Sequence, residues 1–457
     1  MNNTKEKIFV TLLCFLFLMG ALRFFYSTSF KHEGILTTET YLEKKIDSLS
    51  DPDTLERKRT WGPSSKLLYD SIEKYFPNIV STALIWRLIL FLSFFFIIYY
   101  TNKIMNDFRK LFNKKDSLFW SLLLVFAFFQ SSGAIYEIKN GGGEIILGLT
   151  LIGNFYYYYK KKFFIASLFI IFGIFFKITP LIFLFPYFVY SLISKDGRKY
   201  IYYLLCIGLF FSIISYPVQG FFLGSLYPIS ILINVLDQTT SNPIPIWSLE
   251  VFNPLSLINK IIYGFQLDKA GINISGSLVG TAPIYDIPRL TLFISKIFFL
   301  FLFIILLLSS FFLKVFYHNE KMRLFYLLVF QNIIGYTFFI FGVDFSIGCF
   351  VLIVLNIFFP LFFISILFDD LSKIRLLDLS IVFLYIVGLS LIGNLMPISF
   401  LEFFIPYVFF DNLTNYETTK IIGSFGSYNW YAIPLFGISL IFLCFIFLLK
   451  IFNKKNS

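Results

Sequence analysis

The stretch FFIASLFIIFGIFFKITPLIFLFPYFVYSLI, residues 163–193, holds two apolar runs that are separated by a lysine, Lys177. The runs 163–176 and 181–193 are each shorter than the roughly 20 apolar residues that a helix needs to cross a bilayer. Thr179 and Pro180 follow the lysine, and a proline cannot continue the helical hydrogen-bond ladder. The pattern predicts a helical hairpin that turns near one membrane interface, with Lys177 at the turn.

The rest of the chain is equally apolar. Of 457 residues 58% are hydrophobic and only 14% are charged, and the mean hydropathy is +0.78, outside the range of soluble domains. We expect an all-α integral membrane protein, a single polytopic domain over 1–457 with about twelve transmembrane helices. The spans are expected near 8–27, 81–101, 117–136, 145–159, 163–176, 181–194, 201–217, 290–313, 324–342, 347–368, 379–396 and 430–450.

The distribution of charge predicts the orientation. With both termini placed in the cytoplasm, the cytoplasmic side carries just over half of the 38 basic residues but fewer than a third of the 27 acidic ones. This asymmetry is the positive-inside pattern of membrane proteins. The formal charge of +11 is therefore a topology signal, and it argues against a nucleic-acid partner.

Three segments on the outer side are long: 28–80, 218–289 and 397–429. The first is rich in acids, and its stretch 41–49 has apolar residues at a helical spacing, which predicts a short amphipathic helix on the membrane surface. A carboxylate held near that surface could act as a general base toward a hydroxyl group. The second segment contains Asn242 and Trp247 and is typical of a binding loop.

Cysteine and histidine offer little for other chemistry. The four cysteines fall inside apolar spans without paired spacing, and the chain has only two histidines. We therefore expect no metal site, no cofactor and no Ser-His-Asp triad.

Lys177 allows two interpretations. A charge at the bilayer centre costs roughly 2.5–3.5 kcal/mol, so the lysine either extends to the headgroups or is held at membrane depth to meet an anion. Polyprenyl phosphate fits the second case, because its tail stays in the bilayer while its phosphate needs positive partners. The glycines at 141–143 stand before a helix that runs inward, where backbone N–H groups can receive an anion. A simple tight turn, with Glu144 at the helix start, explains them without any ligand and is the favoured interpretation of the glycines alone.

The run 139–190, KNGGGEIILGLTLIGNFYYYYKKKFFIASLFIIFGIFFKITPLIFLFPYF, resembles the central signature of polyprenyl-phosphate-dependent membrane glycosyltransferases of the GT-C superfamily, closest to glycosyltransferase family 87. That signature is a Gly-Gln turn, an apolar span, a short basic loop, a small-residue span and Lys-x-x-Pro. Gly143-Glu144, Lys160 to Lys162 and Lys177 to Pro180 stand at those places in that order, with Glu144 where the family has Gln. The segment 61–77 is similar to the aromatic-Pro-Pro segment before the second span, with Gly62 in place of one proline.

The resemblance implies an inverting hexosyl- or pentosyltransferase with a GT-C-like fold in a bacterial cytoplasmic (inner) membrane. It implies that Lys177, with Gly142 and Gly143, binds the phosphate of a polyprenyl-phosphate sugar donor. A first-loop acid would be the base; the family position, measured back from Tyr41, is Thr37, so Glu39 and Glu33 rank equally and Asp47 follows. Asn242 and Trp247 would contact a lipid or glycan acceptor on the outer face, or pack within their loop.

Two other functions remain open at this point. A lipid-linked glycan flippase or transporter would distribute charges through many spans, whereas this chain has few, among them Arg87 and Lys177. An O-antigen polymerase or ligase also uses lipid-linked sugars on the outer face. The arginines of the outer loops, Arg57, Arg59 and Arg289, are compatible with that function.

Overall fold

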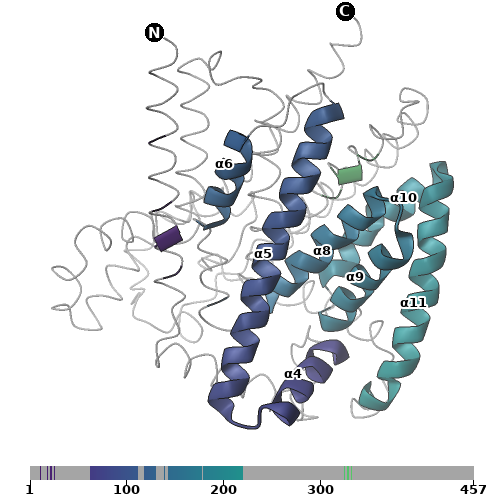
Figure 1. Cartoon of the computed structure of the whole chain (residues 1–457). Coiled ribbons are helices and arrows are strands. Elements are labelled where there is room, and N and C mark those ends of the chain that lie inside the picture. Colours follow the sequence, from purple (N-terminus) through teal and green to yellow (C-terminus); the bar gives the residue numbers. More distant parts are fainter. Residues whose placement is uncertain are drawn as a thin grey trace, which may run out of the picture.

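The computed structural model describes residues 62–111, 118–129, 143–177 and 179–219, together with isolated positions near 11–25, at 138 and near 324–331. In these ranges the regular structure is helical throughout (Figure 1). The expected span at 8–27 and those from 290 onward lie wholly or mostly outside the described residues. The count of about twelve spans and the division into outer loops therefore stay predictions.

Two of the described helices are long and apolar enough to cross a membrane, over Val80–Leu111 and Lys195–Ile214. The first belongs to α5, Ile79–Leu111, and the second to α11, Lys195–Gln219. Helix α5 continues ten residues past the expected end at 101, because the polar stretch that follows contains no glycine or proline to stop it. Helix α6, Leu118–Phe129, occupies part of the expected span 117–136.

Helices α8, Glu144–Tyr159, and α9, Phe163–Phe176, form a helical hairpin that turns at residues 160–162. This is not the expected hairpin of 163–176 with 181–193, because Lys177 lies at the open end and not at the turn. Helices α8 and α9 pack on each other, α8 also contacts α5, and α9 contacts α11, so the hairpin lies between the two long helices (Figure 1). At 1.5 Å per residue the two helices are only about 24 and about 21 Å long, against a hydrocarbon thickness of about 30 Å. The hairpin therefore ends inside the bilayer if its basic turn lies at the cytoplasmic surface.

The hairpin turn is closed by backbone hydrogen bonds of the Schellman type. The amide of Lys161 donates to the carbonyl of Tyr158 at 2.9 Å, and that of Lys162 donates to Tyr157 at 2.9 Å. Lys161 adopts a left-handed φ of 57°, where glycine is usual. Its ammonium group lies 3.0 Å from Asp196 of α11, so the charged side chain links the turn to the neighbouring helix.

Small residues let α8 and α9 approach closely. A Cβ atom placed on Gly173 would lie 2.3 Å from Oγ1 of Thr150, and one placed on Gly153 would lie 2.6 Å from the ring of Phe169. Membrane helices pack through such small residues, because lipid provides no hydrophobic drive for their association. The relative position of the two helices therefore depends on Gly153 and Gly173.

Gly173→Ala is expected to destabilise the protein by about 1–3 kcal/mol, because the added methyl group collides with Thr150 across the hairpin. Thermal unfolding of the purified protein in detergent measures the change. Adding Thr150→Ala removes the nearest colliding atom and should recover part of the loss. Gly208→Ala is the matched control: its Cβ would meet Ile171 at an ordinary 3.4 Å, so stability should stay the same or rise. An equal loss in the two single variants would contradict this account.

The expected span over 181–194 is divided in the structure. Residues Thr179–Leu184 form a 3₁₀ helix, η1, and Phe185–Ile193 form α10, which has nine residues and contacts α11. Pro186 lies in the first turn of α10, where a missing N–H costs nothing, and this favours a new helix start over a continuous span. At about 14 Å, α10 is too short to cross the hydrocarbon core by itself.

A helix that the sequence reasoning did not predict, α4, occupies Pro63–Tyr75. Pro63 begins the helix and Pro77 follows its end, as is usual for these positions. Its buried side chains Tyr69 and Ile72 join the aromatic core, and α4 contacts α9 and α5. The surface helix expected over 41–49 lies outside the described residues.

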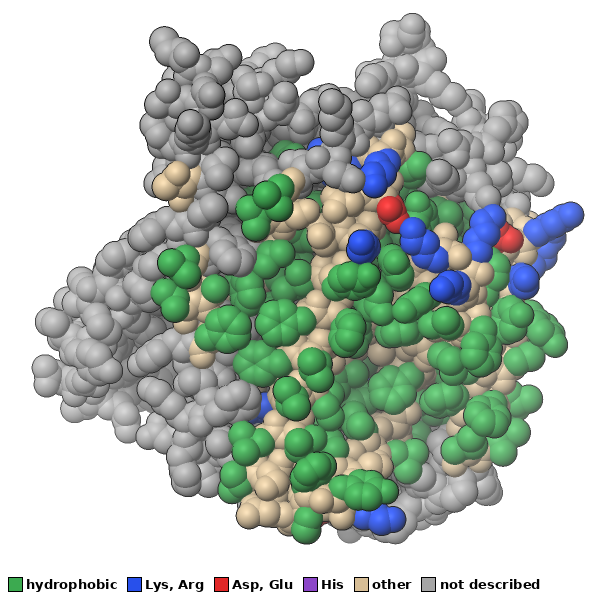
Figure 2. All heavy atoms as spheres, viewed as in Figure 1, with side chains coloured by type: hydrophobic (Ala, Val, Ile, Leu, Met, Phe, Trp, Pro, Cys, Tyr) green, Lys and Arg blue, Asp and Glu red, His purple; other side chains and the backbone are tan. Residues whose placement is uncertain are grey.

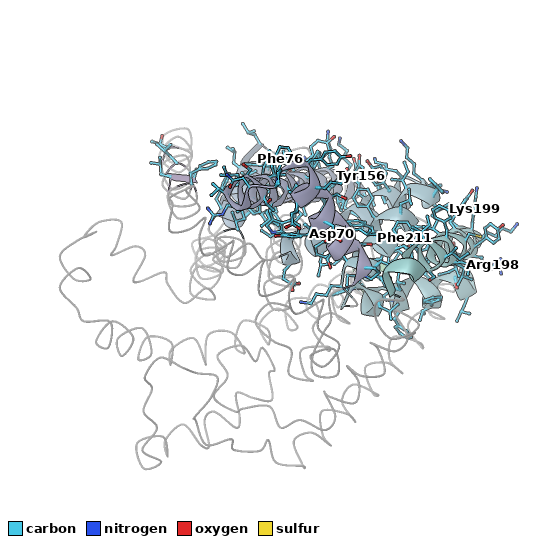
Figure 3. All side chains as sticks on the ribbon, turned by 90° about the horizontal axis from the view of Figure 1, so that it is seen from below. Asp70, Phe76, Tyr156, Arg198, Lys199 and Phe211 are labelled. Atoms are coloured by element: carbon cyan, nitrogen blue, oxygen red, sulfur yellow. The ribbon has the colours of Figure 1, made fainter. Side chains whose placement is uncertain are left out.

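Charges separate the two ends of the described bundle. Figure 2 shows basic side chains gathered along the end opposite α4, and the exposed ones there are Lys103, Lys110, Lys160, Lys161, Lys162, Lys195, Arg198 and Lys199. Figure 3 views the molecule from the α4 end, with Asp70 on α4 and with Arg198 and Lys199 at the margin. This asymmetry agrees with a cytoplasmic position for the basic end.

One ion pair at the basic end links α5 to the hairpin. Lys160 donates to Asp107 at 2.7 Å. Burial by itself would lower the pKa of Lys160, but the hydrogen bond and the negative charge of Asp107 raise it. Because the pair is partly exposed, it contributes at most about 1 kcal/mol to stability.

Candidate functional site

Lys177 and Glu144 form a buried ion pair at the open end of the hairpin. The ammonium group of Lys177 donates to Oε1 of Glu144, and the exposed fractions of the two side chains are 4% and 1%. Lys177 follows directly after α9 in extended backbone, and Glu144 is the first residue of α8. The lysine therefore does not extend to the surface. This contradicts the interpretation in which it reaches the headgroups.

The hairpin geometry explains why these two residues meet. Glu144 stands 16 residues before Lys160 and Lys177 stands 15 residues after Lys162, at nearly equal distances from the turn. In two antiparallel helices of equal rise, such residues lie at the same height. This spacing was a sequence signal for the pair, although Lys177 and Glu144 were interpreted separately.

A buried ion pair is a costly element that requires a reason. Each ion loses several kcal/mol of hydration, which the mutual attraction repays only in good geometry, and apolar replacements are often neutral or stabilising. Ionisable residues at membrane depth therefore mark functional sites by default. Removing only one partner would leave an uncompensated charge, at a cost of about 3–5 kcal/mol.

The start of α8 adjoins the ion pair in sequence, because Glu144 is the first residue of the helix. Gly143 precedes Glu144, and its carbonyl accepts hydrogen bonds from the amides of Ile146 at 3.0 Å and Leu147 at 3.4 Å. The φ of Gly143, −89°, is open to any residue. Only a lack of room around it could therefore exclude a side chain at this position. Gly143 is thus near Lys177, whereas Gly142, its expected companion in phosphate binding, lies outside the described residues.

A backbone contact joins the end of the first outer segment to the residue before Lys177. The amide of Gly62 donates to the carbonyl of Phe176 at 2.8 Å, across 114 positions of sequence. A proline at this position, as in the similar family segment, could not donate this bond. The ring of Phe176 also stacks on Trp86 of α5, with centroids 6.4 Å apart and planes at 10°. The strand-like segment at Lys177 is therefore fixed from two sides.

Arg87 is a second buried cation in the outer half of α5, and the sequence reasoning placed it only near a span end. Its side chain is fully buried, and it follows Trp86, the residue whose ring stacks beside Lys177. The position is about 12 Å along α5 from the first residue, Ile79. Arg87 is therefore a further buried charge in a helix that is long and apolar enough to cross a membrane.

The other expected site residues lie outside the described part of the chain. They are the candidate bases Glu39, Glu33 and Asp47 and the candidate acceptor contacts Asn242 and Trp247. Their roles stay predictions.

The described arrangement can hold an anion at low dielectric. Lys177 offers a buried ammonium group, and charge-assisted contacts are strongest where water is excluded. The site lies at the end of the described bundle where α4 meets the hairpin, opposite the basic turn.

Residues 71–242 match the model of glycosyltransferase family 87. The matched region begins within α4, extends beyond α11 and includes both Glu144 and Lys177. The match confirms the resemblance found in the sequence and implies a glycosyltransferase with a donor and an acceptor substrate. No curated protein and no solved structure matches the chain.

Proposed function

We propose that the protein, with its similarity to glycosyltransferase family 87 over residues 71–242, transfers a sugar from a polyprenyl-phosphate-linked donor to a lipid or glycan acceptor on the outer face of the cytoplasmic membrane. The observation that carries the proposal is the buried ammonium group of Lys177 at the end of the hairpin opposite its basic turn. A lipid phosphate is an anion that can approach such a depth while its tail remains in the bilayer.

The reaction follows from this placement. The donor enters sideways from the lipid, and its phosphate contacts Lys177 and the Gly142–Gly143 turn. A first-loop carboxylate takes the proton of the acceptor hydroxyl as that oxygen attacks the anomeric carbon from the face opposite the phosphate. The bond between the anomeric carbon and the phosphate oxygen breaks, its electron pair leaves with the phosphate, and the configuration inverts. Lys177 stabilises the negative charge that develops on the departing oxygen.

The contact between Gly62 and Phe176 supports a common site for the base and the lysine. The candidate acids lie 15 to 29 positions before Gly62 in the sequence, and Gly62 is fixed 2.8 Å from the residue that precedes Lys177. The contact joins the C-terminal end of that segment to the backbone beside Lys177, and the proposal requires the acids to fold back toward the same point. Asn242 and Trp247 would complete the site as contacts to the acceptor.

The direct test is an assay of the purified full chain, reconstituted in bilayers, with a panel of radiolabelled polyprenyl-phospho-sugars and lipid or glycan acceptors. Transfer of label with at least one donor, with inversion at the anomeric carbon, is the expected result. Movement of the lipid-linked sugar across the bilayer without its release from the carrier would instead indicate a flippase. No transfer and no donor binding across the panel would refute the proposal.

Gly62→Pro is expected to lower transfer, because it removes the N–H that fixes the first outer segment to Phe176. The freed segment should position the base less accurately, so we expect kcat/KM to fall by about tenfold. Gly62→Ala is the matched control, since φ of −113° and ψ of 179° suit any residue and the N–H remains. Equal transfer by the two variants would show that the contact has no role in the reaction.

A further inference from the structure

The carboxylate of Glu144 is paired with Lys177, the cation to which the proposed function assigns the donor phosphate. Lys177 donates to Oε1 of Glu144, and both side chains are almost completely buried. In the similar family motif a neutral glutamine stands at the position of Glu144, and a neutral amide would leave the charge of the lysine uncompensated. In this chain the charge is balanced before any ligand arrives.

We propose that Glu144 is an internal counter-ion that competes with the lipid phosphate for Lys177 and promotes release of the polyprenyl phosphate product. The inference rests on the proposed function and adds a positioning residue to it. When a phosphate contacts Lys177, two anionic groups surround one ammonium group in a site that excludes water. Like charges at short range repel strongly in such surroundings, so the carboxylate weakens phosphate binding.

This repulsion distinguishes product from donor. The donor is a phosphodiester with one negative charge, whereas the product polyprenyl phosphate is a monoester that carries about −1.5 to −2 at pH 7. The carboxylate of Glu144 therefore repels the product more than the donor. Cleavage of the donor adds negative charge to the phosphate, and the carboxylate of Glu144 repels this added charge. The site therefore holds the donor and releases the carrier lipid.

The packing keeps Glu144 in this position. It is the first residue of α8, and the carbonyl of Gly143 before it accepts the first two intrahelical hydrogen bonds. The close approach of Gly173 to Thr150 holds α8 and α9 at a fixed separation. Because the helix start cannot swing away, a bound phosphate shares Lys177 with the carboxylate instead of displacing it to a distance.

The experiment measures binding of polyprenyl phosphate and of a polyprenyl-phospho-sugar to the full chain in lipid nanodiscs. Glu144→Gln keeps the size of the side chain and an acceptor for Lys177 but removes the charge. We expect it to bind polyprenyl phosphate about tenfold more tightly than the unmodified protein, and the phospho-sugar by a smaller factor. In turnover, the donor KM should fall and product inhibition should strengthen. Glu73→Gln, the same change at an exposed site on α4, should alter neither affinity.

A Glu144→Gln protein that binds polyprenyl phosphate no more tightly than the unmodified protein overturns the inference. If that variant does not fold, Glu144→Asp decides: its shorter side chain withdraws the charge from Lys177, so product should bind more tightly than to the unmodified protein, and equal or weaker binding refutes the role. The proposed function fails separately, if the unmodified protein neither binds nor transfers any donor. Transfer that depends on Lys177 but is indifferent to Glu144 removes only the counter-ion.

Discussion

Replacing Lys177 by methionine should abolish sugar transfer, with kcat/KM falling by at least about 10²- to 10³-fold, because the departing phosphate loses its positive partner in a site that excludes water. The substitution has a second effect. It leaves the buried carboxylate of Glu144 without its cation, which should lower the free energy of unfolding by about 3–5 kcal/mol. Transfer assays and thermal unfolding of the same preparation measure the two effects.

A double variant separates the two effects. Lys177→Met with Glu144→Gln removes both charges, so the folded state should recover most of its stability. Transfer should remain absent, since the phosphate still lacks its cation. Recovery of transfer together with stability would show that Lys177 supports only the fold. Normal transfer by the single Lys177→Met variant would reject the assignment of the donor site.

The largest effect outside the hairpin is expected at the first outer segment. One of the variants Glu39→Gln, Glu33→Gln and Asp47→Asn should lower kcat by about 10²- to 10⁴-fold, because it removes the base that takes the proton of the acceptor. Donor binding should be retained, since the proposed phosphate contacts lie at the open end of the hairpin. Turnover of radiolabelled donor measures the effect on kcat, and direct donor binding measures the effect on affinity.

Glu73→Gln again provides the matched control, as an exposed acid on α4 of the same chemical type. It should transfer at the rate of the unmodified protein. If all three first-segment variants transfer normally, the base lies elsewhere in the chain. A variant that loses donor binding as strongly as turnover would point to a phosphate contact instead of a base.

The bounds of α8 and α9 could be predicted from the sequence because the signals for each helix are local, although the expected hairpin paired 163–176 with 181–193. The apolar run 163–176 is bounded by Lys162 and Lys177, and helix α9 has these bounds. Helix α8 begins one residue before the expected position, because Glu144 is well suited to a helix N-terminus. Pro180 also indicated a break after Lys177, but the 3₁₀ segment that follows divides a run that hydropathy presents as one span.

The contacts that make the site were harder to predict, because they depend on register between segments. The pairing of Lys177 with Glu144 required counting from the turn in both directions, and the contact of Gly62 with Phe176 joins segments with no shared pattern. Helix α4 was missed because it is much less apolar overall than the neighbouring spans, although Leu68, Tyr69 and Ile72 have a helical spacing. The roles of the first-loop acids and of Asn242 and Trp247 remain predictions.

The shortness of the hairpin has a consequence for fidelity. If the basic turn lies at the cytoplasmic surface, a helix of 14 residues that rises about 21 Å leaves Lys177 roughly 9 Å short of the outer limit of a hydrocarbon layer of about 30 Å. Bulk solvent is scarce at that depth, and an activated sugar there meets few stray water molecules. Holding the anomeric carbon at this depth would suppress hydrolysis of the donor by water. The donor would then react only when an acceptor is bound.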